Sequence, residues 1–444
     1  MQTSLRGIAN RAASHKKHRF GSLYGLLNEE NLAWCFDFLR KDAAPGVDRV
    51  DYAGYQKNLD SNIHDLVERL KSNRYRAKLV RRRYIPKLNG KMRPLGIPAT
   101  EDKLVQVGVA KILEAIYEQD FLDWSYGYRP QRSPQDAATE LTHSLHHGRY
   151  CWVVEADIKG FFDNIDHDWM IRMLEERIDD KPFLRLIRKW LQAGILETDG
   201  QVVHPVTGTP QGGIVSPVLA NIYLHYALDL WFERRVNPRC RGAAMIIRYA
   251  DDFVCAFQYK SDAEAFYGSL CDRLGKFGLT VAEEKTRILS FSRFDPDGSG
   301  RFDFLGFEFF CDRTRRGFLG VKRRTSRKKL RASLATFTAW IRITRHRPLR
   351  VILQTLKVKY RGYWNYYGVV GNSASAWLSS STGASASCSS GLIVAASDAA
   401  TLGLDSRLCW IRRVYRSQDT VNSPASPLVI LLLVRRAVLR SPVR

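Results

Sequence analysis

Apolar side chains recur along this chain with two different periods, and the two periods separate helices from strands. Between residues 102 and 121 they recur every three or four positions, which predicts a long amphipathic helix. Short apolar runs at 244–247 and 253–257, and the strand-like segment 151–156, are typical of buried strands. Further helices are predicted at 133–147, 168–178, 182–193, 325–343 and 348–367. Helices that surround hairpins of antiparallel strands make an α+β fold.

One predicted helix has clear signals at both ends. Ser133 can serve as its N-cap, Pro134 suits the first helical position, and Gly148 follows the last turn. His143 and His147 share one face of this helix at a spacing of four residues. Because neither an H-E-x-x-H glutamate nor a third ligand lies nearby in the sequence, the pair does not predict a metal site.

A polar step between two of the predicted strands carries the strongest chemical signal. The tetrapeptide Tyr249-Ala-Asp-Asp252 separates two apolar runs, which predicts a β-hairpin with Asp251 and Asp252 at its tip. An isolated Asp-Asp pair is usually a solvated turn, but Asp157 follows another predicted strand and supplies a third carboxylate. Three carboxylates at strand ends can hold two Mg²⁺ ions for displacement at phosphorus, since Mg²⁺ prefers oxygen ligands.

The length of the chain predicts several lobes, and its charge predicts a polyanion as partner. At 444 residues the chain exceeds one compact core, so two or three lobes are predicted. The formal net charge is +24, with dense basic runs at 15–19, 81–83 and 313–331. Trp340, Trp364 and several tyrosines follow the last of these runs. Clustered positive charge interleaved with aromatic rings predicts a nucleic-acid-binding surface.

Cysteine spacing and apolar runs indicate the compartment. The eight cysteines form no C-x-x-C pair, which disfavours a zinc knuckle and suits a reducing environment. The first twenty residues are polar and basic without an apolar signal core. The longest late apolar run, 428–434, is too short to span a bilayer. We therefore expect a cytoplasmic protein with no membrane partner.

Seven short blocks stand in one order between residues 83 and 307. They are Arg83-Tyr-Ile-Pro-Lys-Leu-Asn-Gly-Lys-Met-Arg-Pro-Leu-Gly-Ile-Pro98, Ser125-Tyr-Gly-Tyr-Arg-Pro-Gln-Arg-Ser133, Asp157-Ile-Lys-Gly-Phe-Phe-Asp163, Thr209-Pro-Gln-Gly-Gly-Ile-Val-Ser-Pro217, Tyr249-Ala-Asp-Asp252, Glu284-Lys-Thr286 and Phe304-Leu-Gly-Phe307. In content, order and rough spacing, these blocks resemble those of the reverse transcriptases encoded by bacterial group II introns. A weaker match extends from about Asn31 to Gly371.

The resemblance implies a right-hand polymerase fold, in which fingers and a palm with an antiparallel sheet precede a helical thumb. In this family the thumb also binds the intron RNA. We expect a basic N-terminal arm over residues 1–30 and the reverse transcriptase fingers and palm over 31–310. A thumb or maturase-like helical region should then occupy 311–371.

The resemblance also implies an RNA-directed DNA polymerase that adds deoxynucleotides to a primer 3′-hydroxyl with two Mg²⁺ ions. Asp157, Asp251 and Asp252 are then the catalytic acids and metal ligands, and Ile158 adds a backbone carbonyl to the metal site. The candidate residues for nucleotide binding are Lys87, Arg93, Gly160, Phe161, Phe162 and Gln211. The candidate residues for nucleic acid binding are Arg81, Arg82, Arg83, Gly212, Lys285 and Gly306.

Several of these candidates have individual roles implied by their place in the blocks. Lys87 and Arg93 should meet the triphosphate, and Phe162 should exclude a ribose 2′-hydroxyl, although an ordinary core Phe is the alternative. Gln211 should bond the sugar–phosphate. The expected partners are group II intron RNA, a DNA primer or target, and deoxynucleoside triphosphates, while the oligomeric state is not predicted.

The composition changes abruptly after Gly371. Residues 372–444 contain neither Lys nor Glu, and ten Ser and eight Ala occupy the 29 positions 372–400. The expected Trp/Arg-rich thumb helix is not recognisable there. The segment is therefore an atypical low-complexity tail, which either is native or follows a frameshift.

Alternatives to the polymerase remain open from the sequence. The chain could be a splicing maturase that binds RNA without needing polymerase activity, but RNA binding alone does not require Asp157, Asp251 and Asp252. It could be a decayed intron protein, given its tail. The Arg93-Pro-Leu-Gly-Ile-Pro98 segment argues against a retron or phage-defence polymerase.

Overall fold

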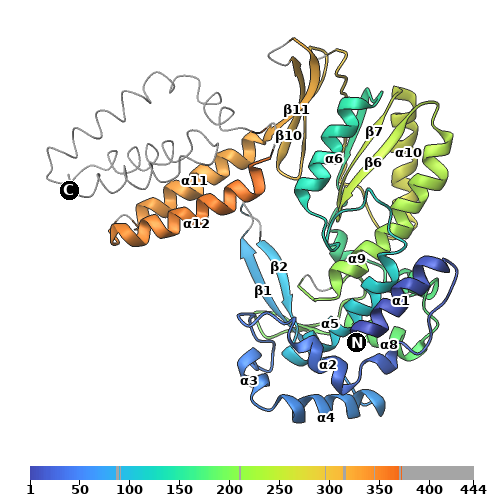
Figure 1. Cartoon of the computed structure of the whole chain (residues 1–444), viewed down its shortest axis with the longest axis vertical. Coiled ribbons are helices and arrows are strands. Elements are labelled where there is room, and N and C mark those ends of the chain that lie inside the picture. The colour runs from blue at the N-terminus through green and yellow to red at the C-terminus, as the bar shows by residue number, and fades with distance from the viewer. Residues whose placement is uncertain are drawn as a thin grey trace. The chain divides into compact units, whose positions relative to one another are not determined.

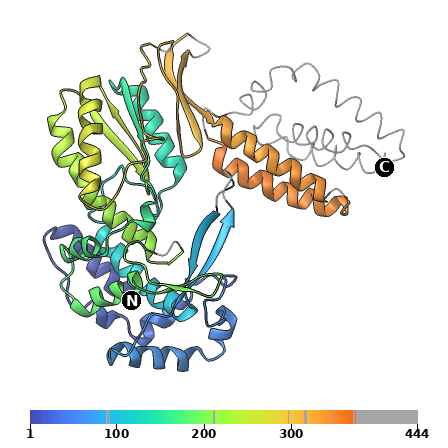
Figure 2. The same cartoon turned by 180° about the vertical axis from the view of Figure 1, so that it is seen from behind.

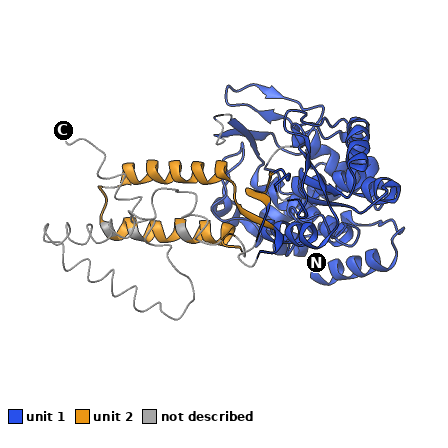
Figure 3. Cartoon of the chain, turned by 90° about the horizontal axis from the view of Figure 1, so that it is seen from above, with its two compact units in different colours: residues 1–300, 311–320 blue, residues 301–310, 321–444 orange. Residues whose placement is uncertain are grey.

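The computed structural model describes residues 1–86, 90, 92–209, 212–295, 297–313, 317–344, 346–369 and 372. Two compact units make up the chain (Figure 3): unit 1 contains residues 1–300 and 311–320, and unit 2 contains 301–310 and the chain from 321 onward. Lys87, Gln211 and the tail beyond Asn372 lie outside the described residues.

Unit 1 begins with helical elements and a hairpin. These are α1 (Gln2–Ser14), η1 (Tyr24–Leu26), α2 (Glu29–Phe36), α3 (Tyr52–Gln56), α4 (Leu59–Lys71), β1 (Val80–Pro86), β2 (Met92–Ile97), α5 (Thr100–Tyr117) and α6 (Pro134–His147). The middle of the unit holds β3 (Trp152–Ala156), η2 (Phe161–Asp163), α7 (His167–Glu175), α8 (Lys181–Leu191), β4 (Ile195–Leu196), β5 (Val202–Val203) and α9 (Ser216–Leu224). It continues through η3 (His225–Asp229), η4 (Phe232–Val236), η5 (Asn237–Arg239), β6 (Ala244–Tyr249), β7 (Asp252–Phe257), α10 (Lys260–Gly275) and β8 (Arg287–Ser290).

A four-stranded antiparallel sheet forms the centre of the site-bearing part of unit 1. Its strand order is β6-β7-β3-β8, so the two strands of the predicted hairpin lie next to the strand that ends at Ala156. Helix α10 packs on β3 and β7, and α6 packs against β6 (Figure 1). The three predicted strands and the hairpin are thereby confirmed, as is the mixed α and β architecture.

A second sheet carries the fingers block. Strands β1 and β2 form a long antiparallel hairpin in which Arg81 pairs with Ile97, drawn in light blue in Figures 1 and 2. The short strand β4 joins β1 in parallel and β5 joins β4, giving the order β2-β1-β4-β5.

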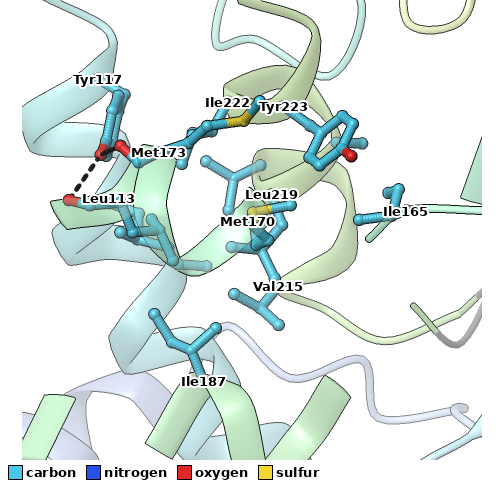
Figure 4. Packing of buried hydrophobic residues seen from close by; sticks show 14 of the residues in the cluster. Leu113, Tyr117, Ile165, Met170, Met173, Ile187, Val215, Leu219, Ile222 and Tyr223 are labelled. Carbon is cyan, nitrogen blue, oxygen red and sulfur yellow. Dashed lines mark hydrogen bonds between the residues drawn. The ribbon is translucent and has the colours of Figure 1, made fainter. Parts of the chain in front are cut away.

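The main core of unit 1 lies where α5, α7, α8 and α9 meet. Leu113 of α5, Met170 of α7, Ile187 of α8 and Leu219 of α9 face one another there (Figure 4). All four are at most 1% exposed. The hydroxyl of Tyr117 donates to the carbonyl oxygens of α7 at Met173 and Leu174, 3.4 and 3.3 Å away, which satisfies the one polar atom of a buried ring.

Helix ends agree closely with the sequence signals. Ser133 accepts from the Asp136 N–H at 3.1 Å, and the Asp136 carboxylate accepts from the Ser133 N–H at 2.9 Å, so α6 begins with a capping box.

Helix α5 ends at Tyr117 rather than at residue 121. The N–H of Phe121 still donates to the carbonyl of Tyr117, and the Phe121 ring is buried. The apolar pattern in the sequence therefore continues beyond the last residue of the helix.

Residues 1–30, expected as an arm, are packed into unit 1. Helix α1 lies against α5, and Ala12, Phe20 and Leu27 are buried in the core. The guanidinium of Arg177 donates to the carbonyl of Ala12 at 3.2 Å. This segment therefore contributes to the fold of unit 1.

Unit 2 is built from strands that precede two long helices. Strand β9 (Phe302–Phe304) pairs with β10 (Phe307–Arg313), which pairs with β11 (Leu319–Thr325), and the chain continues into α11 (Arg327–Thr344) and α12 (Leu349–Tyr367). Residues 311–313 of β10 and 319–320 of β11 belong to unit 1. The end of α12 is tied to the β9–β10 turn, since Tyr366 donates to the Leu305 carbonyl at 3.0 Å and its ring stacks on Phe307. Asn372 adds hydrogen bonds to Thr325.

A fully buried ionic cluster links separate segments of unit 1. Arg248 in β6 is 0% exposed, and its guanidinium donates to both carboxylate oxygens of Asp229 at 2.7 and 2.5 Å. It also donates to the Asn221 side chain at 3.1 Å, to the Ser125 hydroxyl at 2.7 Å and to the Ala250 carbonyl at 3.0 Å. These five bonds use all five N–H donors of the guanidinium.

We expect the Asp229→Ala substitution to lower the free energy of unfolding by about 3–5 kcal/mol, because it leaves a buried guanidinium without its counter-ion. Urea unfolding followed by circular dichroism measures this. The control is Asp42→Ala, which removes an ion pair to Arg40 whose side chains are 80% and 75% exposed. Water screens such an exposed pair, so its loss should hardly change the free energy of unfolding. Equal effects of the two substitutions would contradict a structural role for the buried cluster.

Candidate active site

The tip of the β6–β7 hairpin presents two neighbouring carboxylates. Tyr249 pairs with Asp252 across the strands, which leaves Ala250 and Asp251 as a two-residue turn. Ala250 has a φ of 58°, in the left-handed region that residues with a Cβ seldom adopt. Two-residue hairpin turns require positive φ at their first position to match the twist of the strands. Asp251 is partly buried at this turn and Asp252 is exposed.

The third carboxylate reaches the same edge of the sheet from β3. Ala156 lies opposite Phe253 in the antiparallel β3–β7 pair. Asp157 directly follows Ala156, and Asp252 directly precedes Phe253, so the two carboxylates stand at the same end of adjacent strands. The carbonyl of Asp157 accepts from the Ala282 N–H at 2.8 Å, which fixes the end of the strand. The structure thus gathers the three acids that the sequence predicted.

Electrostatics at the turn favour a bound cation. Burial raises the pKa of Asp251, and the nearby negative charge of Asp157 raises it further. The charges of Arg93 and Arg248 act in the opposite direction, but the net shift remains upward. A carboxyl group that is partly buried beside another carboxylate gains from any cation that neutralises both.

Lys285 supplies a positive charge beside the acids. Its ammonium donates a hydrogen bond to a carboxylate oxygen of Asp157, and this bond raises the pKa of the lysine. The N–H groups of Lys285 and Thr286 both donate to the carbonyl of Ala282, so a turn holds the lysine beside the acid. The sequence placed Lys285 near the site, and the structure gives it a partner there.

The acids fit a divalent ion by their donor chemistry. Three carboxylates offer the oxygen ligands that Mg²⁺ prefers. Among the residues that the structure describes, no three His, Cys, Asp or Glu side chains are grouped closely enough to hold an ion by themselves. Mg²⁺ commonly takes only one or two protein carboxylates and completes its shell with water and substrate phosphates. Water and substrate phosphates would therefore have to complete the coordination shell of any ion held by these acids.

The loop after Asp157 contains two adjacent phenylalanines that differ in burial. Phe161 is 2% exposed and packs in the core, 6.4 Å from the ring of Tyr223, whereas Phe162 is only partly buried. Gly160 begins this loop with a φ of 58°. The carbonyl of Phe162 accepts from the Thr209 N–H at 2.8 Å, which holds the loop against the 209–217 block. Phe162 is therefore the more exposed of the two residues.

The fingers hairpin places its basic residues in different surroundings. Arg93 pairs with Ile85 across the hairpin, and its charge lowers the pKa of Asp251, so the two side chains are close enough to interact. Arg82 is engaged by the protein, since its Nε donates to Glu197 at 2.9 Å. Arg83 is exposed and Arg81 partly buried.

Two glycines among the candidates have structural reasons for being glycine. Gly212 has a φ of 117°, and a Cβ there would lie 2.5 Å from the carbonyl oxygen of Gly96 in β2. The 209–217 block therefore packs directly on the fingers strand. Gly306 lies in unit 2, where it and Leu305 both have positive φ, as a type I′ hairpin turn requires.

Sequence reasoning missed the residues that support the catalytic turn. Ser125, Asn221 and Asp229 hold Arg248, which in turn bonds the carbonyl of Ala250. A signal existed in the sequence, because Arg248 is a lone charge beside the apolar run 244–247 and such a residue needs a partner when buried. Its partners could not be named, since they come from distant segments.

No helix in the described part of the chain is long and apolar enough to cross a membrane.

Comparison with known proteins gives the family. Residues 85–309, just over half of the chain, match the reverse transcriptase (RNA-dependent DNA polymerase) family. Protein YkfC of Escherichia coli strain K12 is 34% identical over 66% of this chain and 83% of its own length.

Other relatives are proteins of introns. The group II intron-encoded protein LtrA of Lactococcus lactis subsp. cremoris is 49% identical over 41% of this chain, and a 91 kDa protein in the cob intron of Schizosaccharomyces pombe is 44% identical over 38%. The matched segments span only 32% and 21% of those two relatives. The chain belongs to the reverse transcriptase family, the RNA-directed DNA polymerases, and within it to the group II intron type.

Proposed function

We propose that this chain extends a primer with deoxynucleotides on an RNA template, using two divalent metal ions held at Asp157, Asp251 and Asp252, and that it binds group II intron RNA. The observation that carries the proposal is the meeting of these three acids at one edge of the β6–β7–β3 sheet. Binding RNA would not require them, whereas phosphoryl transfer does.

The acids and the ions have complementary tasks. When bound, two Mg²⁺ ions lower the barrier to attack by the primer 3′-hydroxyl and neutralise the leaving pyrophosphate. Asp157, Asp251 and Asp252 would hold the ions through their carboxylates, and the backbone carbonyl of Ile158 would be a further protein ligand. Burial and the like charge of Asp157 both raise the pKa of Asp251, and a bound cation would offset both effects, which supports this assignment.

The residues around the acids would bind the incoming nucleotide. Arg93 interacts with Asp251, which places a positive charge where a triphosphate would approach the acids. We assign Lys87 and Gln211 to the triphosphate and the sugar–phosphate, respectively, from their positions in the family blocks. Gly160 and Phe161 would offer backbone N–H groups to the phosphates.

Phe162 would select the sugar, because its ring is partly exposed while that of Phe161 is buried in the core. A bulky ring beside C2′ of the nucleotide leaves no room for a hydroxyl group. Lys285 would hold the carboxylate of Asp157 in place through their hydrogen bond.

The RNA-binding proposal rests on charge. Residues 327–367, which include α11 and α12, contain no Asp or Glu but many Arg and Lys. Arg327, Lys328 and Arg331 at the start of α11 are exposed. Trp340 adds an aromatic surface, with the Lys359 ammonium 5.2 Å from the centre of its ring. Such a surface suits a phosphate backbone with unpaired bases.

The Asp251→Asn substitution should reduce Mg²⁺-dependent extension of a DNA primer on an RNA template by more than about a hundredfold. A neutral amide is a poor ligand for a hard cation, and even outer-shell changes cost metal sites about 10–100-fold. Single-turnover primer extension measures the rate. The control is Asp168→Asn on α7, whose side chain is 71% exposed, and it should extend at the wild-type rate. Wild-type extension by the Asp251 variant would remove that residue from the metal site.

The Phe162→Val substitution should raise incorporation of ribonucleotides relative to deoxynucleotides, because it opens space beside the sugar. The measurement is the ratio of kcat/KM for the two triphosphates. Phe161→Val is the matched control, and we expect it to lower stability without changing the ratio, since its ring is 2% exposed. The opposite outcome would move the sugar selection to Phe161.

The Lys328→Ala substitution should weaken RNA binding and reduce the slope of log affinity against log salt by about one, as expected for one lost phosphate contact. Filter binding at several salt concentrations measures the slope. Lys260→Ala is the control, because that lysine already pairs with Glu264 at 3.2 Å. The RNA of the parent intron should also compete better than a random duplex of equal length. Equal competition would contradict specific intron binding.

A further inference from the structure

Tyr128 is an exposed aromatic residue that the roles assigned above do not use. It lies in the segment between α5 and α6, and its side chain is 51% exposed. Its φ is 58°, in the left-handed region that bulky side chains rarely occupy. A strained residue with a large exposed ring next to a catalytic centre calls for a functional explanation.

The chain just before Tyr128 is packed against the catalytic turn. The N–H of Tyr126 donates to the carbonyl of Arg248 at 2.8 Å. At Gly127 a Cβ would lie only 2.2 Å from the backbone nitrogen of Ala250, so no side chain fits between this segment and the turn. The carbonyl of Gly127 accepts from the Asn221 side chain at 2.6 Å. The segment can therefore shift little relative to the acids.

The chain just after Tyr128 is anchored as well. Arg129 is 7% exposed, and its Nε donates to Glu118 at 3.0 Å. Its Nη1 donates to the carbonyls of Leu122 and Ser125 at 2.8 and 2.7 Å. Fixed neighbours on both sides hold the Tyr128 backbone in its strained conformation.

The charges that act on Tyr128 belong to the proposed site. Burial of part of the phenol raises its pKa, and the charges of Asp251 and Asp252 raise it further, while Arg93 lowers it. Tyr249 also contributes. Tyr128 thus lies within reach of both the acids and the arginine that would bind the triphosphate.

We propose that Tyr128 is a positioning residue whose ring packs against the base of the incoming nucleotide. This inference rests on the proposed function, which places the triphosphate between Arg93 and the acids. A nucleotide held there by its phosphates must place its sugar and base beside the same surface, where Tyr128 presents an exposed ring. Aromatic rings stack on any base, so the contact would hold all four nucleotides without reading their sequence.

The test is single-nucleotide addition by Tyr128→Asn. Asparagine tolerates left-handed φ, so the variant removes the ring while keeping the backbone. We expect the KM for the deoxynucleoside triphosphate to rise about tenfold, a change within the range that base–aromatic stacking contributes. The affinity for primer–template should stay unchanged. The rise should be larger for purine than for pyrimidine triphosphates, because a larger base offers more stacking area.

Two further variants separate this role from a structural one. Tyr128→Phe keeps the ring and should restore the low KM. Tyr259→Asn removes another tyrosine, which is 41% exposed. Tyr259 lies just after β7, at the end of that strand away from the acids, so its substitution should leave the KM unchanged. Thermal unfolding of all three variants should match the wild type.

An unchanged KM in Tyr128→Asn would overturn the proposal, as would lost primer–template affinity with an unchanged KM. A KM rise of equal size for purines and pyrimidines, with a lowered melting temperature, would show a structural role instead. Each of these results requires a wild-type protein that extends primers, so they differ from a failure of the polymerase proposal, in which the wild type itself would be inactive.

Discussion

The buried guanidinium of Arg248 is the constraint on which the arrangement of the acids depends. It lies directly before the turn and bonds the turn through the carbonyl of Ala250. Its remaining donors reach Ser125, Asn221 and Asp229, which come from three separate segments. Because the five N–H donors point in fixed directions, each partner restricts where the others can lie. The strained turn at Ala250 is held by this network as well as by the strand pairing.

Such rigid support matters because the acids repel one another. Burial and the charge of Asp157 both disfavour ionisation of Asp251. Lys285 and Arg93 partly offset the repulsion from outside the sheet. A site that holds like charges together in advance has less reorganisation to perform when cations and phosphates arrive.

The three acids and the basic helices lie in different units of the chain. Asp157, Asp251 and Asp252, the fingers strand with Arg93 and the loop with Phe162 belong to unit 1. Unit 2 contributes helices that carry Arg and Lys without any Asp or Glu between residues 327 and 367. Hydrogen bonds from Tyr366 and Asn372 tie the end of α12 to the strands of this unit. The proposed catalytic and RNA-binding residues can thus be tested separately by substitution.

The sequence by itself determined the local elements, the family and the three acids. Periodicity and end signals located the β6–β7 hairpin and the capped helix α6, because strand alternation and capping depend on neighbouring residues. The order of the seven blocks identified the family. Only the tertiary structure decided that Phe162 is accessible while Phe161 is core, that Arg82 is engaged by Glu197, and that Gly212 packs on Gly96. It alone revealed the partners of Arg248 and the position of Tyr128, because contacts between residues far apart in the chain arise from packing and leave no periodic trace in the sequence.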